Sequence, residues 1–215
     1  MEPTDDELLE AWRGGDEAAA ETLMRRHFAA IYRFFRHKLP EEVEEATQRT
    51  FLGCVESAPR FRGDSSFRGF LFAIARKQLM LALRKKHRAA RVFDPDRLSL
   101  HEVDAGSVAS PTGVIAQRED EQLLLGALRR LPVDFQITVE LFYWEELPIA
   151  DIAVVLEIAE GTVKSRLGRA RAMLKVQIEA LAASPGVAQT TMRGFEDWAR
   201  RLHGEGPSDD DSDVE

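Results

Sequence analysis

Residues 148–175, PIADIAVVLEIAEGTVKSRLGRARAMLK, contain two helical patterns separated by a short break. Pro148 suits the first turn of a helix, where its missing N–H has no intrahelical partner to lose. The first pattern repeats apolar residues at helical spacing, at Ile149, Ile152, Ala153 and Leu156. The second does the same after residues 157–159, at Val163, Leu167, Ala170 and Leu174. The stretch therefore predicts two amphipathic helices in helix-turn-helix form.

The face of the second helix opposite its apolar stripe is basic. Together with the helix start, it supplies the candidate DNA-binding residues Thr162, Lys164, Ser165, Arg166, Arg169 and Arg171. A helix fits the major groove, where guanidinium groups reach guanine edges or phosphates, and the amides at its N-terminus attract phosphate. The pattern favours a DNA-reading helix over the alternative, an ordinary helical hairpin with a solvated basic face.

Basic charge is concentrated in two islands of the 215-residue chain. The formal net charge of −8 alone argues against a nucleic-acid partner. Residues 60–91, however, carry ten basic side chains and one acidic one, and residues 160–175 carry five and one. Residues 205–215 hold six acids and no base. Because salt confines surface fields to about 8–10 Å, the islands favour local contact with a polyanion.

Composition limits both the fold class and the chemistry. Hydrophobic residues make up 44% and charged residues 31%, and no strand-like alternation recurs, so an all-α fold is expected. The single cysteine, Cys54, excludes an internal disulfide and a cysteine-built metal site. The five histidines show no ligand spacing, and no catalytic constellation is present. We therefore expect no enzymatic activity, no cofactor and no metal.

No stretch is typical of a membrane span or an export signal. The longest apolar stretches, such as residues 70–75, are far shorter than the roughly 18 residues that a span needs. The first residues are acidic and lack the basic-then-apolar order of a signal peptide. A cytoplasmic location without membrane insertion is the expectation.

The remaining patterns predict two helical modules joined by a flexible linker. Apolar spacing and breakers predict helices over residues 5–13, 16–38, 41–59 and 67–86, with Asp16 capping the second and Asp64 or Ser65 capping the fourth. Residues 92–117 are rich in Pro, Gly, Ser and acids and read as the linker. Periodicity then resumes up to residue 144. The expected divisions are residues 1–91, 92–117, 118–183 and 184–215, the last holding a short helix over 195–202 and a disordered acidic tail.

At this point a family resemblance becomes specific. Residues 161–171, GTVKSRLGRAR, following Asp151-Ile152-Ala153, resemble region 4 of the extracytoplasmic-function (ECF) sigma factors of bacterial RNA polymerase. Glu157 stands where that family often has glycine, so a positive φ in the turn would strain the backbone. DNA-binding domains of the LuxR type have a similar recognition helix, which leaves a stand-alone transcription regulator as the alternative. A module that docks acidic protein partners is a second one.

The N-terminal module favours the sigma factor. Residues 45–52, EATQRTFL, resemble the region 2 motif that grips the clamp helices of polymerase, and residues 61–76, FRGDSSFRGFLFAIAR, resemble the adjoining promoter element. The resemblance implies that core polymerase is bound by Glu44, Glu45, Gln48, Arg49 and Phe51. For the melted strand of the upper promoter box, the candidates are Arg60, Phe61, Arg62, Asp64, Ser65, Arg68, Phe70, Arg76, Lys77 and Arg84.

The same resemblance implies the partners and the activity. Core RNA polymerase would be contacted at its clamp helices and its flap, and promoter DNA at two boxes. The factor would melt DNA by binding energy alone, since stacking of an extruded base on an aromatic ring contributes about 1–3 kcal/mol. An anti-sigma partner is expected by family analogy only.

Overall fold

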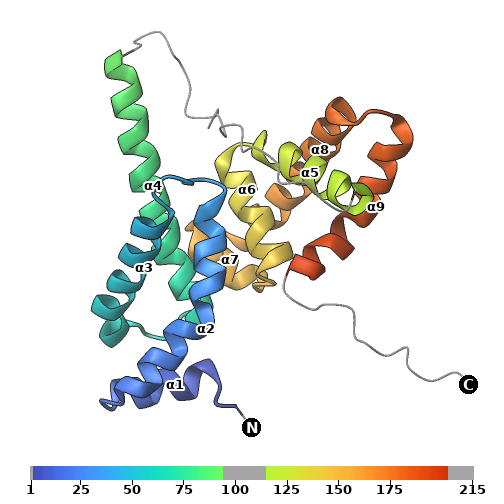
Figure 1. Cartoon of the computed structure of the whole chain (residues 1–215). Coiled ribbons are helices and arrows are strands. Elements are labelled where there is room, and N and C mark those ends of the chain that lie inside the picture. Colours follow the sequence, from blue (N-terminus) through green and yellow to red (C-terminus); the bar gives the residue numbers. More distant parts are fainter. Residues whose placement is uncertain (1, 94–114, 203–215) are drawn as a thin grey trace, which may run out of the picture. The chain divides into compact units, whose positions relative to one another are not determined.

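The structure, a computed structural model, describes residues 2–93 and 115–202, and every regular element within these ranges is a helix (Figure 1). The all-α expectation is confirmed. The chain divides into two compact units, one formed by residues 1–105 with 148–163 and the other by residues 106–147 with 164–215. Most of the predicted linker and the acidic end lie outside the described residues. No helix in the described ranges is long and apolar enough to cross a bilayer.

The first unit begins with two helices whose starts are fixed by local capping. Helix α1 (Asp5–Arg13) carries a capping box, in which Thr4 and Glu7 satisfy each other's backbone N–H groups. Helix α2 (Glu17–Arg36) is capped by Asp16, which accepts from the amides of Ala18 and Ala19 and confirms the predicted cap. The unit continues with α3 (Val43–Ser57), a 3-10 turn (Ala58–Arg60), α4 (Phe67–Phe93) and α7 (Ile149–Leu156).

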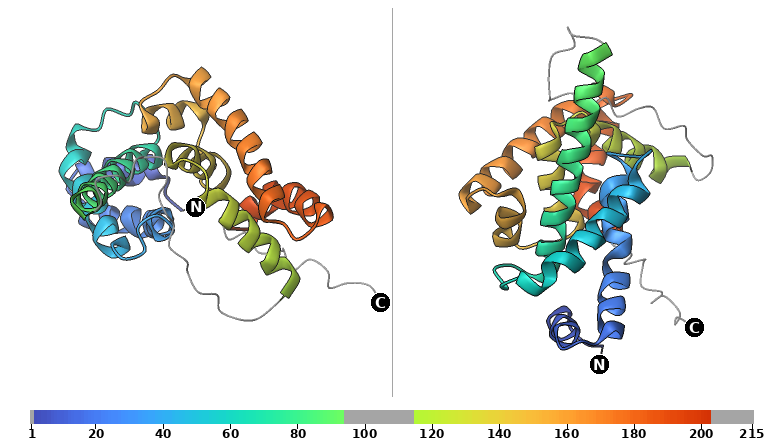
Figure 2. Two further views of the ribbon diagram at one scale, coloured as in Figure 1. Left: turned by 90° about the horizontal axis from the view of Figure 1, so that it is seen from above. Right: turned by 90° about the vertical axis from the view of Figure 1, so that its left-hand side faces the viewer.

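Helix α4 differs from its prediction at both ends. The cap is Ser66, whose hydroxyl accepts from the Gly69 amide at 3.0 Å, so the assignment of Asp64 or Ser65 was wrong by one or two residues. Its end lies at Phe93 instead of about residue 86, since the basic stretch continues the helix without a breaker. Figure 2 shows the C-terminal part of α4 extending beyond the other helices of its unit.

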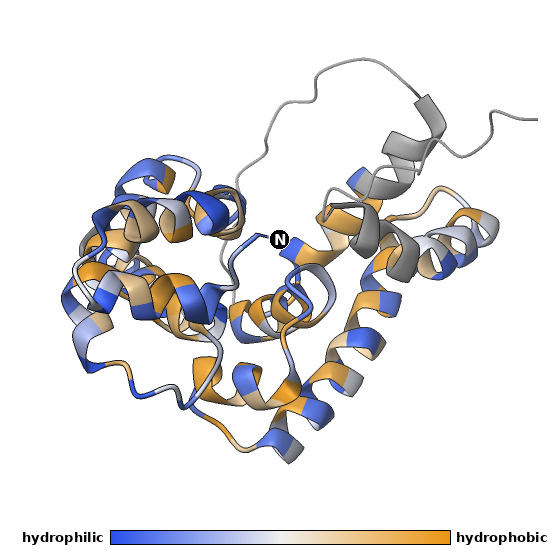
Figure 3. Ribbon diagram, turned by 90° about the horizontal axis from the view of Figure 1, so that it is seen from below, coloured by the Kyte–Doolittle hydropathy of each residue, from blue (hydrophilic) through white to orange (hydrophobic). Residues whose placement is uncertain are grey.

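The core of the first unit is aromatic and aliphatic. Its completely buried side chains include Leu23, Ile31, Phe35, Phe67 and Phe72. Phe34 meets both Phe35 and Phe72 edge-on, with ring centroids 5.3 and 5.6 Å apart. Hydrophobic and hydrophilic residues alternate along the helices as amphipathic packing requires (Figure 3).

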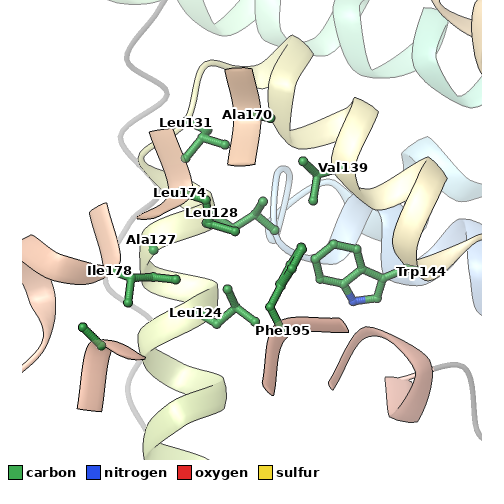
Figure 4. Packing of buried hydrophobic residues seen from close by; sticks show 11 residues of the cluster. Leu124, Ala127, Leu128, Leu131, Val139, Trp144, Ala170, Leu174, Ile178 and Phe195 are labelled. Atoms are coloured by element: carbon green, nitrogen blue, oxygen red, sulfur yellow. The ribbon is translucent and has the colours of Figure 1, made fainter. Parts of the chain in front are cut away.

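The second unit contains α5 (Ile115–Arg129), α6 (Val133–Val139), a π-helical turn (Glu140–Trp144), most of α8 (Glu160–Leu181) and α9 (Pro185–Leu202). Its core joins α5, α8, α9 and the π turn, with Phe195 of α9 lying against Trp144 and Leu124 (Figure 4). Helix α9 is longer than the predicted 195–202 because Pro185 opens it, in the position where proline is best tolerated.

Candidate functional site

The loop between the 3-10 turn and α4 is anchored by a residue of α1. Arg13 donates hydrogen bonds to the carbonyl oxygens of Phe61 and Ala58, the latter at 3.4 Å. Its guanidinium also lies 5.9 Å from the centre of the Phe61 ring, within cation–π range. The loop is therefore fixed at its N-terminal end by a side chain of α1.

The predicted loop residues surround an aromatic pair. The rings of Phe61 and Phe70 are stacked with centroids 4.5 Å apart, which places a flat apolar surface beside the loop. Gly63 turns the chain with φ 80°, a conformation that glycine adopts without strain. Around it Arg60, Arg62 and Asp64 are exposed, while Ser65 is half-buried. The structure thus brings the polar loop and the two aromatic residues together.

The predicted basic residues of α4 lie in different surroundings. Lys77 and Arg84 are exposed, whereas Arg68 and Arg76 are half-buried. Arg76 donates to the Val155 carbonyl of α7 at 3.4 Å and lies 3.9 Å from the Glu157 carboxylate, and its side chain is 19% exposed. In this arrangement Lys77 and Arg84 are accessible to a phosphate backbone, and Arg76 is engaged by α7.

The turn after α7 has the strained geometry that the sequence suggested. Glu157 ends the helix in the left-handed conformation, with φ 57° and ψ 43°. The amide of Ile158 then bonds back to the Ala153 carbonyl at 3.0 Å, which closes the helix end. The expectation that Glu157 replaces a glycine-type position is confirmed.

Helix α8 presents the predicted basic face to solvent. Five of its six candidates are exposed, namely Thr162, Lys164, Ser165, Arg169 and Arg171. The sixth, Arg166, is half-buried, while Val163 and Leu174 of the opposite stripe are buried. Gly168 has open space around its Cβ direction and leaves a gap in the exposed face.

Aromatic side chains of the second unit contact three of these arginines. The guanidinium groups of Arg166 and Arg169 each lie 5.9 Å from the centre of the Phe135 ring. Arg171 donates through Nε to the hydroxyl of Tyr143 and lies 5.3 Å from its ring centre. The basic face is thus held partly by rings that sequence spacing did not single out.

A third feature is an apolar groove between α2 and α3, with a volume of about 540 Å³. Its walls contain Met24, Phe28 and Tyr32 from α2 and Glu44, Thr47, Gln48, Phe51, Leu52 and Val55 from α3. Phe28 and Leu52 are 51% and 55% exposed, although both are large and apolar. Such a contiguous exposed apolar surface is typical of a protein-binding site.

Three of the five residues predicted to bind polymerase line this groove, namely Glu44, Gln48 and Phe51. Glu45 and Arg49 lie on the same helix and form an exposed ion pair with each other at 2.6 Å, outside the groove lining. Sequence reasoning missed the α2 wall. Phe28 lies five residues after Leu23, off the buried stripe of α2, and it is exposed and stacks on Phe51 with ring centroids 5.9 Å apart.

Comparisons with known proteins agree with this arrangement. Residues 21–89 match the family model of sigma-70 region 2, and residues 121–174 match that of sigma-70 region 4. The ECF RNA polymerase sigma factor SigM of Mycobacterium tuberculosis is 34% identical over 177 residues, covering 80% of this chain and 84% of the relative. The ECF sigma-E factor of Escherichia coli K12 is 25% identical over 183 residues, covering 83% and 96%.

A solved structure shows the same fold. It is the sigma factor RpoE of Bartonella quintana in complex with the anti-sigma factor NepR, with a TM-score of 0.58 and 22% identity, covering 74% of this chain and 96% of that one. The match to region 2, in addition to region 4, supports a sigma factor over a stand-alone LuxR-type regulator. The chain belongs to the ECF sigma factors of bacterial RNA polymerase, which direct promoter recognition and transcription initiation.

Proposed function

We propose that the groove between α2 and α3 is the surface that receives the clamp helices of core RNA polymerase. Its floor is apolar and its rim carries Glu44 and Gln48, the combination of hydrophobic centre and polar edge found at protein interfaces. Glu45 and Arg49 extend the polar rim along α3. An amphipathic helix laid along the groove would cover the exposed ring of Phe28 and the half-buried ring of Phe51.

The loop before α4 is assigned to the melted strand of the upper promoter box. The stacked pair Phe61 and Phe70 offers an apolar face to an extruded base, and Arg60, Arg62, Asp64 and Ser65 offer polar groups around it. The exposed Lys77 and Arg84 are assigned to the phosphate backbone, which fixes register without reading sequence. Arg68 and Arg76 are assigned to it as well, but both are half-buried, and Arg76 has to leave Val155 and Glu157 to reach a phosphate. Melting then requires no chemical step, and we assign no catalytic activity to the chain.

The exposed face of α8 is assigned to the distal promoter box in duplex DNA. Its candidates are Thr162, Lys164, Ser165, Arg166, Arg169 and Arg171, and the residue classes match those that contact guanine edges and phosphates. The accompanying division is a region 2 module over residues 1–91, a linker over 92–117, a region 4 module over 118–183 and an extension over 184–215. Because the two modules are joined, binding of one module to its promoter box raises the effective concentration of the other module at the second box.

Further partners follow from the relatives. A contact of region 4 with the polymerase flap is proposed on the family resemblance alone. The RpoE relative was solved with an anti-sigma factor, and the exposed groove and basic faces of this chain offer surfaces that such a regulator could cover. We place the protein in the cytoplasm, where core polymerase is found.

The observation that carries the proposal is the exposed apolar groove on the segment that matches region 2. Its test is the substitution Leu52→Glu, which puts a charge into the groove, compared with Val176→Glu on α8. The two side chains are similarly exposed, Leu52 to 55% and Val176 to 59%. Leu52→Glu should weaken binding to core polymerase at least tenfold in a titration, and Val176→Glu should change it less than twofold. Equal binding by both variants would contradict the assignment.

The promoter assignments are tested by transcription in vitro with core polymerase on a genomic promoter library. Templates that yield transcripts define the two boxes. Permanganate footprinting on these templates should show reactive thymines in the upper part of the proximal box, with Phe61→Ala and Phe70→Ala reducing their reactivity. Absence of reactive thymines on every active template would overturn the melting role.

A further inference from the structure

Phe135 is placed where two arginines of the recognition face meet. It lies in the first turn of α6, half-buried, and packs against the core formed by α5, α8 and α9. The guanidinium carbons of Arg166 and Arg169 both lie 5.9 Å from the centre of its ring. Because the two arginines are three residues apart on α8, they share one side of the helix.

Two guanidinium groups on one side of a helix repel each other. Arg169 is restrained in part by a hydrogen bond that its Nε donates to the Ser165 carbonyl oxygen at 3.4 Å. The negative face of an aromatic ring attracts cations. A ring that both arginines contact therefore offsets their repulsion and reduces the number of side-chain rotamers that each arginine populates. Arginine has a long side chain whose rotamer freedom is lost when it binds DNA. A ring that restricts it beforehand reduces that loss, which is the general advantage of preorganisation.

We propose that Phe135 is a positioning residue for promoter recognition, which holds Arg166 and Arg169 in the orientation that they use on the distal promoter box. The inference rests on the proposed function of α8 and adds a residue that lies outside the recognition helix. Phe135 touches no DNA in this role. It acts through the two arginines, and its loss lowers their contribution without removing their charge.

Arg171 provides an internal control. It belongs to the same basic face but contacts a different ring, that of Tyr143, through a hydrogen bond to the hydroxyl and a cation–π distance of 5.3 Å. A substitution at Phe135 should therefore leave the contribution of Arg171 unchanged. This difference separates positioning by one ring from a general loosening of the unit.

The experiment measures binding of reconstituted holoenzyme to duplex DNA carrying the distal box from an active template, by fluorescence anisotropy. Phe135→Leu keeps an apolar side chain without the ring, and Phe135→Trp keeps a ring. Phe135→Leu should raise the Kd three- to tenfold, and Phe135→Trp should stay within twofold of the parent. Thermal melting of each factor serves as the measure of folding.

A double-mutant cycle then assigns the effect to the arginines. In an Arg166→Gln/Arg169→Gln background, Phe135→Leu should change the Kd less than twofold, whereas in an Arg171→Gln background it should keep its full effect. An unchanged Kd for Phe135→Leu, or the same loss with and without the two arginines, would overturn the inference. If the double arginine variant itself binds as tightly as the parent, the assignment of α8 fails and the inference fails with it.

Discussion

Asp151 of α7 accepts hydrogen bonds from both the backbone amide and the hydroxyl of Ser66, the residue that caps α4. The hydrogen bond from the Ser66 amide to the Asp151 carboxylate is 3.3 Å long, and Asp151 is almost completely buried. A carboxylate at this place also faces the positive end of the α4 dipole. The contact joins a loop assigned to the melted strand with a helix that follows 85 residues later in the sequence.

The lack of a side chain at Gly69 allows the Asp151 carboxylate to approach the start of α4, and a substitution at this position tests the contact. A Cβ at position 69 would lie 3.2 Å from the Asp151 carboxyl group. Gly69→Ala should therefore destabilise the parent protein, because the carboxylate has to move from Ser66. In an Asp151→Ala background the same change should stabilise by about 0.5–1 kcal/mol, since alanine is the better helix former. Urea unfolding of the four proteins measures both values, and stabilisation by Gly69→Ala in both backgrounds would contradict the contact.

The left-handed conformation of Glu157 predicts a stabilising substitution. Glu157→Gly should raise the free energy of unfolding by about 1 kcal/mol, because glycine adopts a positive φ without the Cβ penalty. Glu157→Ala is the matched control, since it removes the same carboxylate near Arg76 but keeps a Cβ. If alanine stabilises as much as glycine, the carboxylate and not the backbone accounts for the gain.

Much of the fold could be predicted because it is encoded locally. Capping at Asp16 and the positive φ at Glu157 each follow from one residue and its neighbours. Local rules indicated Asp64 or Ser65 as the cap of α4, whereas the structure uses the next residue, Ser66. The choice of Ser66 goes together with its bonds to Asp151, which no periodicity in the sequence can reveal.

Arg13 illustrates the same limit at the site. Its place in the last turn of α1 predicts a surface cation near the helix C-terminus, whereas the structure has it hold the carbonyls of Ala58 and Phe61. The groove between α2 and α3 could be predicted in part. Gln48 and Phe51 could be proposed from the sequence through family resemblance, but the exposure of Phe28 depends on how α2 and α3 pack.

The Arg13 contacts predict an effect on promoter opening without an effect on polymerase binding. Arg13→Ala should reduce permanganate reactivity in the proximal box two- to tenfold, because the Phe61 backbone loses its anchor. Binding to core polymerase should change less than twofold. Arg25→Ala serves as the control, since Arg25 lies exposed on α2 and pairs only with Glu21 in the described contacts. A loss of opening of the same size in both variants would remove the specific role of Arg13.

The Asp5 carboxylate predicts a dependence of stability on pH. Burial raises the pKa of Asp5, but hydrogen bonds and charges from His27 and Arg26 outweigh it, so the pKa lies below its ordinary value. A lowered pKa stabilises the folded state at pH above the ordinary value of 3.8, and the contribution is lost as the pH falls through the folded pKa.

Asp5→Asn should therefore be less stable than the parent at pH 5, where the parent carboxylate is charged. The difference should shrink as the pH falls to about 3. Urea unfolding at each pH gives the two free energies. Asp6→Asn is the control, since Asp6 is the exposed neighbour in the same helical turn. A difference between parent and Asp5→Asn that stays constant from pH 5 to pH 3 would mean that the ion pair does not contribute.

The burial of Phe195 indicates that α9 is an integral part of the second unit, although this helix lies beyond the residues matched to region 4. The side chain is 3% exposed, and its ring meets Tyr143 and Trp144 at 4.7 and 6.1 Å. Phe195→Ala should lower the free energy of unfolding by about 3–5 kcal/mol, the range for large-to-small changes in a core. Val187→Ala on the same helix should cost less than about 0.5 kcal/mol, because Val187 is 38% exposed. Tyr143 contacts both the Phe195 ring and Arg171. Phe195→Leu keeps a large apolar side chain beside Tyr143, so it should weaken DNA binding less than Phe195→Ala does. Equal stability of Phe195→Ala and Val187→Ala in urea would show that α9 does not complete the core.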